Sequence, residues 1–173
     1  MLKKTFAIAF PLFVCLTFTA ATSDDPSYEV TIELELARFE GRSHRPFVAV
    51  WVENKKKEVV SNVAVWYNKP RWLHDLRQWF NRNSDEGNRQ LDGVTGATRS
   101  PGKHTVKWDL KDKGGNELKA GKYTIYIEAA REHGTYQLLK QEINLNGKPQ
   151  HYELTGGVEI TSASVDYHLM SNN

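Results

Sequence analysis

The chain has 173 residues, with 39% hydrophobic and 25% charged side chains. Its 23 basic and 21 acidic residues nearly cancel, and no basic stripe is visible, which argues against a nucleic-acid partner. The single cysteine, Cys15, lies in an apolar N-terminal segment, so the rest of the chain can form neither a disulfide nor a cysteine metal site.

The N-terminus has the three parts of a secretory signal peptide. Lys3 and Lys4 make it positive, residues 6–18 are apolar, and Thr19-Ala20-Ala21 is a small-residue cleavage site. The apolar run is too short to count as a membrane span. We therefore expect residues 1–21 to be cleaved on export and residues 22–173 to form a single domain. An exported chain without disulfides fits the bacterial periplasm, because a chain of this size can bury a core without them.

Most of the mature chain shows strand patterns. Residues 30–36 alternate apolar and polar side chains, which is typical of a strand with one face in the core. Residues 47–52 are apolar on both faces and predict a more central strand. Further strands are expected at residues 59–66, 103–110, 123–130, 137–145, 152–154 and 158–168. Strands joined by short turns, such as the one at Lys55-Lys56-Lys57, predict an all-β sandwich.

A long insert, residues 68–101, interrupts the strands, and long ordered insertions are often functional. Pro70 can open a helix, and four large apolar side chains follow at helical spacing: Trp72, Leu76, Trp79 and Phe80. We expect one short helix over residues 72–82. Two interpretations of this stripe stay open. It packs on the sandwich, as aromatic stripes at helical spacing usually do, or Trp72 or Trp79 contacts a ligand.

The insert ends in a seven-residue motif, Asp92-Gly93-Val94-Thr95-Gly96-Ala97-Thr98. This run resembles the Asp-x-x-(Ser/Thr)-Gly-Ala-Thr motif of proteins that carry FMN on a threonine. In those proteins a flavin transferase moves FMN from FAD onto the last threonine, outside the cytoplasm. The resemblance implies that Thr98 is the attachment point, and we expect Asp92, Thr95, Gly96 and Ala97 to belong to the same cofactor-binding site.

The residues of the motif suit such an acceptor. Gly96 and Ala97 leave the backbone beside Thr98 accessible to another protein's active site, and Asp92 can orient the loop by bonding its own backbone. An acceptor is expected on an exposed, flexible loop. The competing interpretation is a small-residue turn between two strands.

Other residues of the insert are candidate neighbours of the flavin. Trp72 or Trp79 would border the isoalloxazine ring, and Arg71 or Arg99 would stabilise its anionic reduced form. Arg99 directly follows the acceptor and would also pair with the phosphate diester. The competing interpretation for both arginines is a solvated surface charge.

Residues 108–123 add a second resemblance. They contain Trp108-Asp109, the turn Gly114-Gly115-Asn116, and the series Ala120-Gly121-Lys122-Tyr123. This pattern is similar to the immunoglobulin-like domain of flagellar hook-capping proteins. It implies a fold element rather than a flagellar function, with Trp108 in the core and Tyr123 at a strand corner.

The whole mature chain resembles the predicted periplasmic proteins grouped as domain-of-unknown-function family 2271. The resemblance rests on the leader, residues 47–53, Val65-Trp66-Tyr67, Trp72-Leu73, the seven-residue motif and residues 108–123. It implies an exported module with an immunoglobulin-like antiparallel β-sandwich fold. Some members are thought to be flavinylated and to work beside membrane-bound electron carriers.

Two functions follow as hypotheses. The first is a periplasmic electron-transfer flavoprotein, a carrier rather than an independent catalyst, with FMN linked covalently to Thr98. Its partners would be a flavin transferase and a membrane-bound redox protein. The alternative is a non-redox interaction module that binds a protein or glycan through Trp72 or Trp79. We find no hydrolase constellation, and the six histidines show no metal-ligand spacing.

Overall fold

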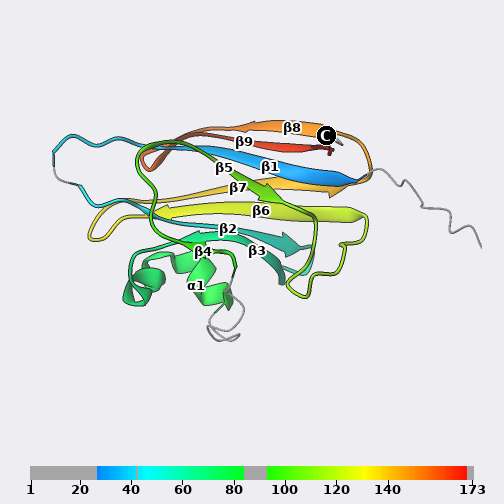
Figure 1. Cartoon of the computed structure of the whole chain (residues 1–173), viewed down its shortest axis with the longest axis horizontal. Helices are drawn as coiled ribbons and strands as arrows, with labels where there is room; N and C mark the ends of the chain where they lie inside the picture. Colours follow the sequence, from blue (N-terminus) through cyan, green and yellow to red (C-terminus); the bar gives the residue numbers. More distant parts are fainter. Residues whose placement is uncertain (1–26, 42, 84–92, 171–173) are drawn as a thin grey trace, which may run out of the picture.

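The computed structural model describes residues 27–41, 43–83 and 93–170, which form two stacked β-sheets (Figure 1). One sheet has the strand order β5-β1-β9-β8, and the other has the order β4-β3-β2-β6-β7. The expected all-β sandwich is confirmed, whereas the expected signal peptide lies outside the described residues. The strands are β1 (Tyr28–Leu36), β2 (Phe47–Asn54), β3 (Val59–Trp66), β4 (Thr95–Gly96), β5 (Gly102–Trp108), β6 (Gly121–Ala130), β7 (Tyr136–Leu145), β8 (Gln150–Leu154) and β9 (Ile160–Leu169).

The main core lies between the two sheets. The alternating apolar residues of β1, including Val30, Ile32 and Leu34, meet Val50 of β2 and Ile127 of β6 there, and all of these are at most 1% exposed. Each fully buried side chain of this kind stabilises the fold by about 1.5–3 kcal/mol. The period-two pattern of the sequence therefore reports which face of each strand points inward.

Strand β2 is buried on both faces, as its continuous apolar pattern predicts. It pairs antiparallel with β3 on one side and with β6 on the other. Val48, Val50 and Val52 point into the main core, whereas Phe47 and Trp51 point to the opposite face of the sheet. The insert packs against that opposite face and shields it from solvent.

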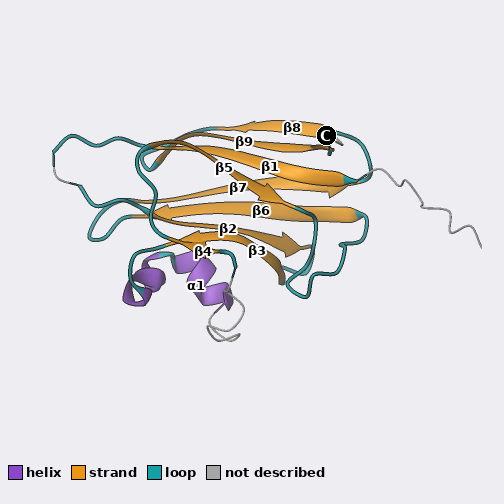
Figure 2. Ribbon diagram, in the orientation of Figure 1, coloured by secondary structure: helices purple, strands orange, loops and turns teal. Residues whose placement is uncertain are grey.

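The insert covers the outer face of the five-stranded sheet with two helical segments (Figure 2). The structure divides the expected single helix into a 3-10 helix, η1 (Pro70–Asp75), and an α-helix, α1 (Arg77–Asn83). The break falls at Leu76, whose backbone has φ −79° and ψ 72°. Leu73, Leu76 and Trp79 from these segments pack in one cluster against β2. Among the described residues, no helix is long and apolar enough to cross a membrane.

Two turns have the structures that their sequences predict: the lysine turn between β2 and β3, and the strand corner at Tyr123. The lysine turn between β2 and β3 is exposed, and the Asn54 side-chain oxygen accepts hydrogen bonds from the backbone N–H groups of Lys56 and Glu58. Trp108 is only 2% exposed. The Tyr123 hydroxyl donates to the Lys119 carbonyl at 2.9 Å, which fixes the strand corner.

Candidate cofactor-attachment site

The middle of the seven-residue motif is attached to the edge of the five-stranded sheet. Thr95 and Gly96 form β4, which runs parallel to β3 opposite Val65 and Trp66. The Val65 N–H donates to the Val94 carbonyl at 2.9 Å. This parallel pair is an exception to the expected antiparallel sheets, and it shows that the motif is not simply a free loop. Asp92 lies outside the described residues.

Thr98 follows two residues after β4, in a segment that crosses from one sheet to the other and leads into β5. Residues 97–100 have no regular secondary structure. Ala97 and Arg99 are exposed and Thr98 is half-buried. Within the described part of the chain, the Thr98 hydroxyl forms no hydrogen bond. The acceptor is thus accessible, while the backbone just before it has a fixed position.

The side chain of Arg99 folds back on the motif. Its guanidinium carbon lies 5.3 Å from the centroid of the Trp66 ring, an arrangement that favours a cation–π interaction. Arg99 Nη2 also lies 3.8 Å from the position that a Cβ atom on Gly96 would occupy. The exposed Arg99 therefore keeps its positive charge beside the motif instead of extending into solvent.

Trp66 and His104 complete this edge of the sandwich. The His104 ring meets the Trp66 ring edge-on at 5.5 Å, and His104 Nε2 lies 2.7 Å from the Ser100 carbonyl oxygen. Sequence analysis did not assign either residue to the site. Trp66 fits the alternation of β3 and is therefore interpreted from the sequence as a core residue. His104 is 38 residues away along the chain and lies on β5 of the other sheet, so only the stacking of the two sheets brings the two rings together.

The two candidate tryptophans of the insert have different environments. Trp79 is 2% exposed, and its Nε1 donates to Asn62 Oδ1 at 2.9 Å, so it belongs to the packing beneath the insert. Trp72 is half-buried at the edge of the same cluster. Its ring lies 4.8 Å from the Arg71 guanidinium carbon, so Arg71 also stays close to the insert. Of the two tryptophans, Trp72 is the one with an accessible side chain.

Buried charged groups hold the insert on the sheet. The Glu128 carboxylate is fully buried and accepts hydrogen bonds from the backbone N–H groups of Gln78 at 2.9 Å and Trp79 at 2.8 Å. Burial raises the pKa of Glu128, and these two hydrogen bonds act in the opposite direction. Glu53 is likewise buried; it pairs with Arg82 and accepts a hydrogen bond from Trp51 Nε1 at 2.9 Å. These contacts fix helix α1 of the insert on the sheet.

A cleft of about 500 Å³ opens on the other side of the motif, between β3 and β5. Val94 lines it together with polar residues, among them Asn62, Lys107 and Lys111. Lys107 pairs with Glu29 at 2.7 Å, and Lys111 Nζ lies 3.6 Å from Asp109. No group of three or more His, Cys, Asp or Glu side chains that could hold a metal ion occurs within residues 27–41, 43–83 and 93–170.

Comparison with protein-family models assigns the chain to a family. The model of the family described as "Predicted periplasmic protein (DUF2271)" matches residues 27–162. Comparisons with curated proteins and with solved structures found no match. The chain belongs to this family of predicted periplasmic proteins, whose description states neither an activity nor a ligand.

Proposed function

We propose that this member of a predicted periplasmic family is an electron carrier with FMN esterified to the Thr98 hydroxyl. The observation that carries the proposal is the position of Thr98. It follows a strand that is fixed to the sheet edge, and its hydroxyl has no hydrogen-bond partner among the described residues. A modifying enzyme can thus reach the hydroxyl without first breaking an interaction.

The neighbouring residues fit a phosphate diester. Gly96 and Ala97 add almost no side-chain bulk beside the acceptor. Arg99 keeps its guanidinium near the motif through its contact with the Trp66 ring. An arginine side chain carries five N–H donors, which suit the oxygens of a phosphate. Arg99 is therefore suited to balance the charge of the diester.

The attachment reaction balances with FAD as the donor. The Thr98 oxygen forms a bond to the phosphorus of the FMN half, the pyrophosphate P–O bond breaks, AMP leaves, and the hydroxyl proton is released. A flavin transferase supplies this chemistry, so the acceptor needs no catalytic residues. A covalent link suits an exported carrier because the bound fraction then no longer depends on the concentration of free ligand.

Once bound, FMN supplies reversible electron exchange with a membrane-bound redox protein. The role of this chain is to hold the tether in place. The hydrogen bonds of β4 to Val65 and Tyr67 fix the segment before Thr98, and the insert that precedes it is held by Glu128 and Glu53.

The rival proposal, a non-redox interaction module, now rests on Trp72 alone. The Trp79 side chain is 2% exposed and cannot serve as a surface anchor without unfolding the insert. No arrangement of the described residues singles out a protein or glycan partner for Trp72, so we do not propose this function.

The test is the mass of the mature chain after co-expression with a flavin transferase in the periplasm. We expect a gain equal to FMN minus one water, located on Thr98 by fragmentation. Thr98→Val should abolish the gain. Thr105→Val is the matched control, because Thr105 is an exposed threonine on β5 outside the motif, and it should keep the full gain. Loading of the Thr98→Val protein, or no loading of the unaltered protein beside an active transferase, would overturn the proposal.

A further inference from the structure

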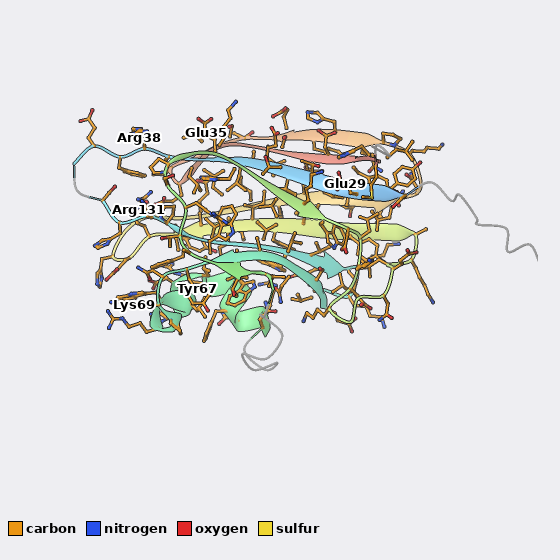
Figure 3. The ribbon with its side chains drawn as sticks, viewed as in Figure 1. Glu29, Glu35, Arg38, Tyr67, Lys69 and Arg131 are labelled. Atoms are coloured by element: carbon orange, nitrogen blue, oxygen red, sulfur yellow. The ribbon has the colours of Figure 1, made fainter. Side chains whose placement is uncertain are left out.

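A second cleft, of about 320 Å³, lies between η1 and the turn that joins β6 to β7. The 3-10 helix η1 and this turn are at the same end of the sandwich as the segment that follows β4 (Figure 1). Figure 3 shows Tyr67, Lys69 and Arg131 at this end as well. The lining of the cleft includes Trp72, His74, Asp75, Arg77, His133 and Tyr136.

The walls of the cleft are aromatic. Trp72 and Tyr136 are both half-buried, so part of each ring stays accessible. The His133 ring meets the Trp72 ring edge-on at 5.9 Å. His133 adopts φ +53°, a left-handed conformation that favours glycine, so its side chain occupies this turn against a backbone preference. Such an aromatic site suits a flat ring system.

Two arginines bring positive charge to the cleft and its rim. The Arg77 guanidinium carbon lies 5.0 Å from the Tyr136 ring centroid, and the Arg71 guanidinium carbon lies 4.8 Å from the Trp72 ring centroid. Neither arginine forms an ion pair with a carboxylate within the described residues. Among the described residues, Asp75 is the one carboxylate in the lining, and its Oδ1 lies 3.4 Å from His74 Nε2. Arg131, also at the cleft, is neutralised by Glu159 at 2.7 Å.

The backbone path from the acceptor segment to the cleft is short. The Tyr67 N–H donates to the Gly96 carbonyl at 2.9 Å, and the Trp72 N–H donates to the Lys69 carbonyl at 3.0 Å. Only residues 67–69 lie between these two hydrogen bonds, and three residues span at most about 10 Å. A ligand tethered to Thr98, two residues after Gly96, thus begins close to η1.

We propose that this cleft, defined by Trp72, His133, Arg77 and Tyr136, receives the isoalloxazine ring of FMN tethered to Thr98. The inference rests on the proposed function, because it needs the tether. The half-buried Trp72 offers accessible indole surface for contact with the ring, and Arg77 and Arg71 favour the form of the ring that carries negative charge. The cleft beside Val94 is the less suitable place. Its one aromatic lining residue, Trp108, is 2% exposed, and its Lys107 is already paired with Glu29.

The test uses the full mature protein, loaded with FMN and checked by mass. Flavin fluorescence is measured for Trp72→Leu, because a stacked indole quenches flavin emission. We expect several-fold brighter emission from Trp72→Leu than from the unaltered protein. Phe80→Leu is the matched control, since Phe80 is a 39% exposed aromatic residue of the same insert outside the cleft, and its emission should not change.

The midpoint potential gives a second readout that does not depend on the fold around Trp72. Arg77→Gln should lower the potential, since it removes a positive charge that favours the reduced form. Lys107→Gln, in the cleft beside Val94, should leave it unchanged. Full loading with unchanged emission in Trp72→Leu and an unchanged potential in Arg77→Gln would overturn the cleft assignment and leave the proposed function intact. A larger effect of Lys107→Gln would assign the ring to the other cleft. A chain without any mass gain would overturn both proposals.

Discussion

The backbone N–H of Tyr67 donates to the carbonyl of Gly96 at 2.9 Å. This bond joins the residue after β3 to the centre of the motif, although the two are 29 positions apart in the sequence. It places the acceptor segment at the open edge of the sandwich, with an exposed residue on each side of Thr98. The position of the proposed attachment site therefore depends on sheet pairing and not on the local sequence alone.

Gly96 can accept a methyl group without loss of stability. A Cβ there would lie 3.5 Å from Trp66 Cδ1 and 3.8 Å from Arg99 Nη2, which are ordinary contacts. We expect Gly96→Ala to change the free energy of unfolding by less than about 1 kcal/mol in denaturant titrations. The added bulk beside the acceptor should nevertheless slow FMN transfer in a time course followed by mass. Transfer at the unaltered rate would show that Gly96 is not needed for access to Thr98.

Removal of Arg131 should destabilise the end of the sandwich where the second cleft lies. Arg131 and Glu159 are buried and form an ion pair at 2.7 Å, and Arg131 also donates to the His44 carbonyl. Arg131→Ala leaves the Glu159 carboxylate buried without its partner, which costs about 3–5 kcal/mol. Thermal and denaturant unfolding measure this loss.

The matched control is Lys122→Ala, which breaks an exposed pair with Glu142 of the same length, 2.7 Å. Surface pairs of this kind contribute little, so its unfolding curve should coincide with that of the unaltered protein. Equal losses in the two variants would contradict the view that burial gives the Arg131–Glu159 pair its importance.

Glu128 should make the stability of the domain depend on pH. Burial raises the pKa of its carboxyl in the folded state, so between the ordinary and the raised pKa the folded protein binds more protons than the unfolded chain. The free energy of unfolding therefore falls as the pH rises through that interval. Glu128→Gln should remove this part of the pH dependence, as measured by denaturant titrations across the acidic range. An identical profile in the variant would contradict the assignment.

His151 is expected to change the stability with the same sign as Glu128, at higher pH. Its ring contacts Asp166 at 2.8 Å and Glu153 at 3.0 Å on the exposed face of β8 and β9, and these hydrogen bonds raise its pKa, with Asp166 as the largest cause. Its contribution to stability is fully present below the pKa of the unfolded chain and is lost as the pH rises through the folded-state pKa. NMR titration of His151 should give a pKa above the ordinary histidine value, and Asp166→Asn should lower it. A pKa unaffected by Asp166→Asn would show that the contact does not persist in solution.

The strands could be predicted from the sequence because their faces differ in polarity. The alternation in β1 and the double-sided apolar pattern of β2 are direct consequences of burial. Strand β4 could not be predicted in this way. Two residues carry no period, and the partner strand β3 ends 29 residues earlier.

The division of the insert into two helical segments could likewise not be predicted from local sequence patterns. Trp72 and Trp79 share a helical stripe in the sequence, yet only Trp79 is fully packed. The reason is the break at Leu76, after which α1 begins with the N–H groups of Gln78 and Trp79 bound by Glu128. Glu128 lies 49 residues after Trp79, so no local pattern reveals that the helix is interrupted there.

The central claim is most directly tested by the mass of the protein purified from the periplasm of a host that contains a flavin transferase. We expect a mass gain of one FMN, less one water, on Thr98 and nowhere else in the chain. A protein of unmodified mass from such a host, or FMN on any other residue, would contradict it.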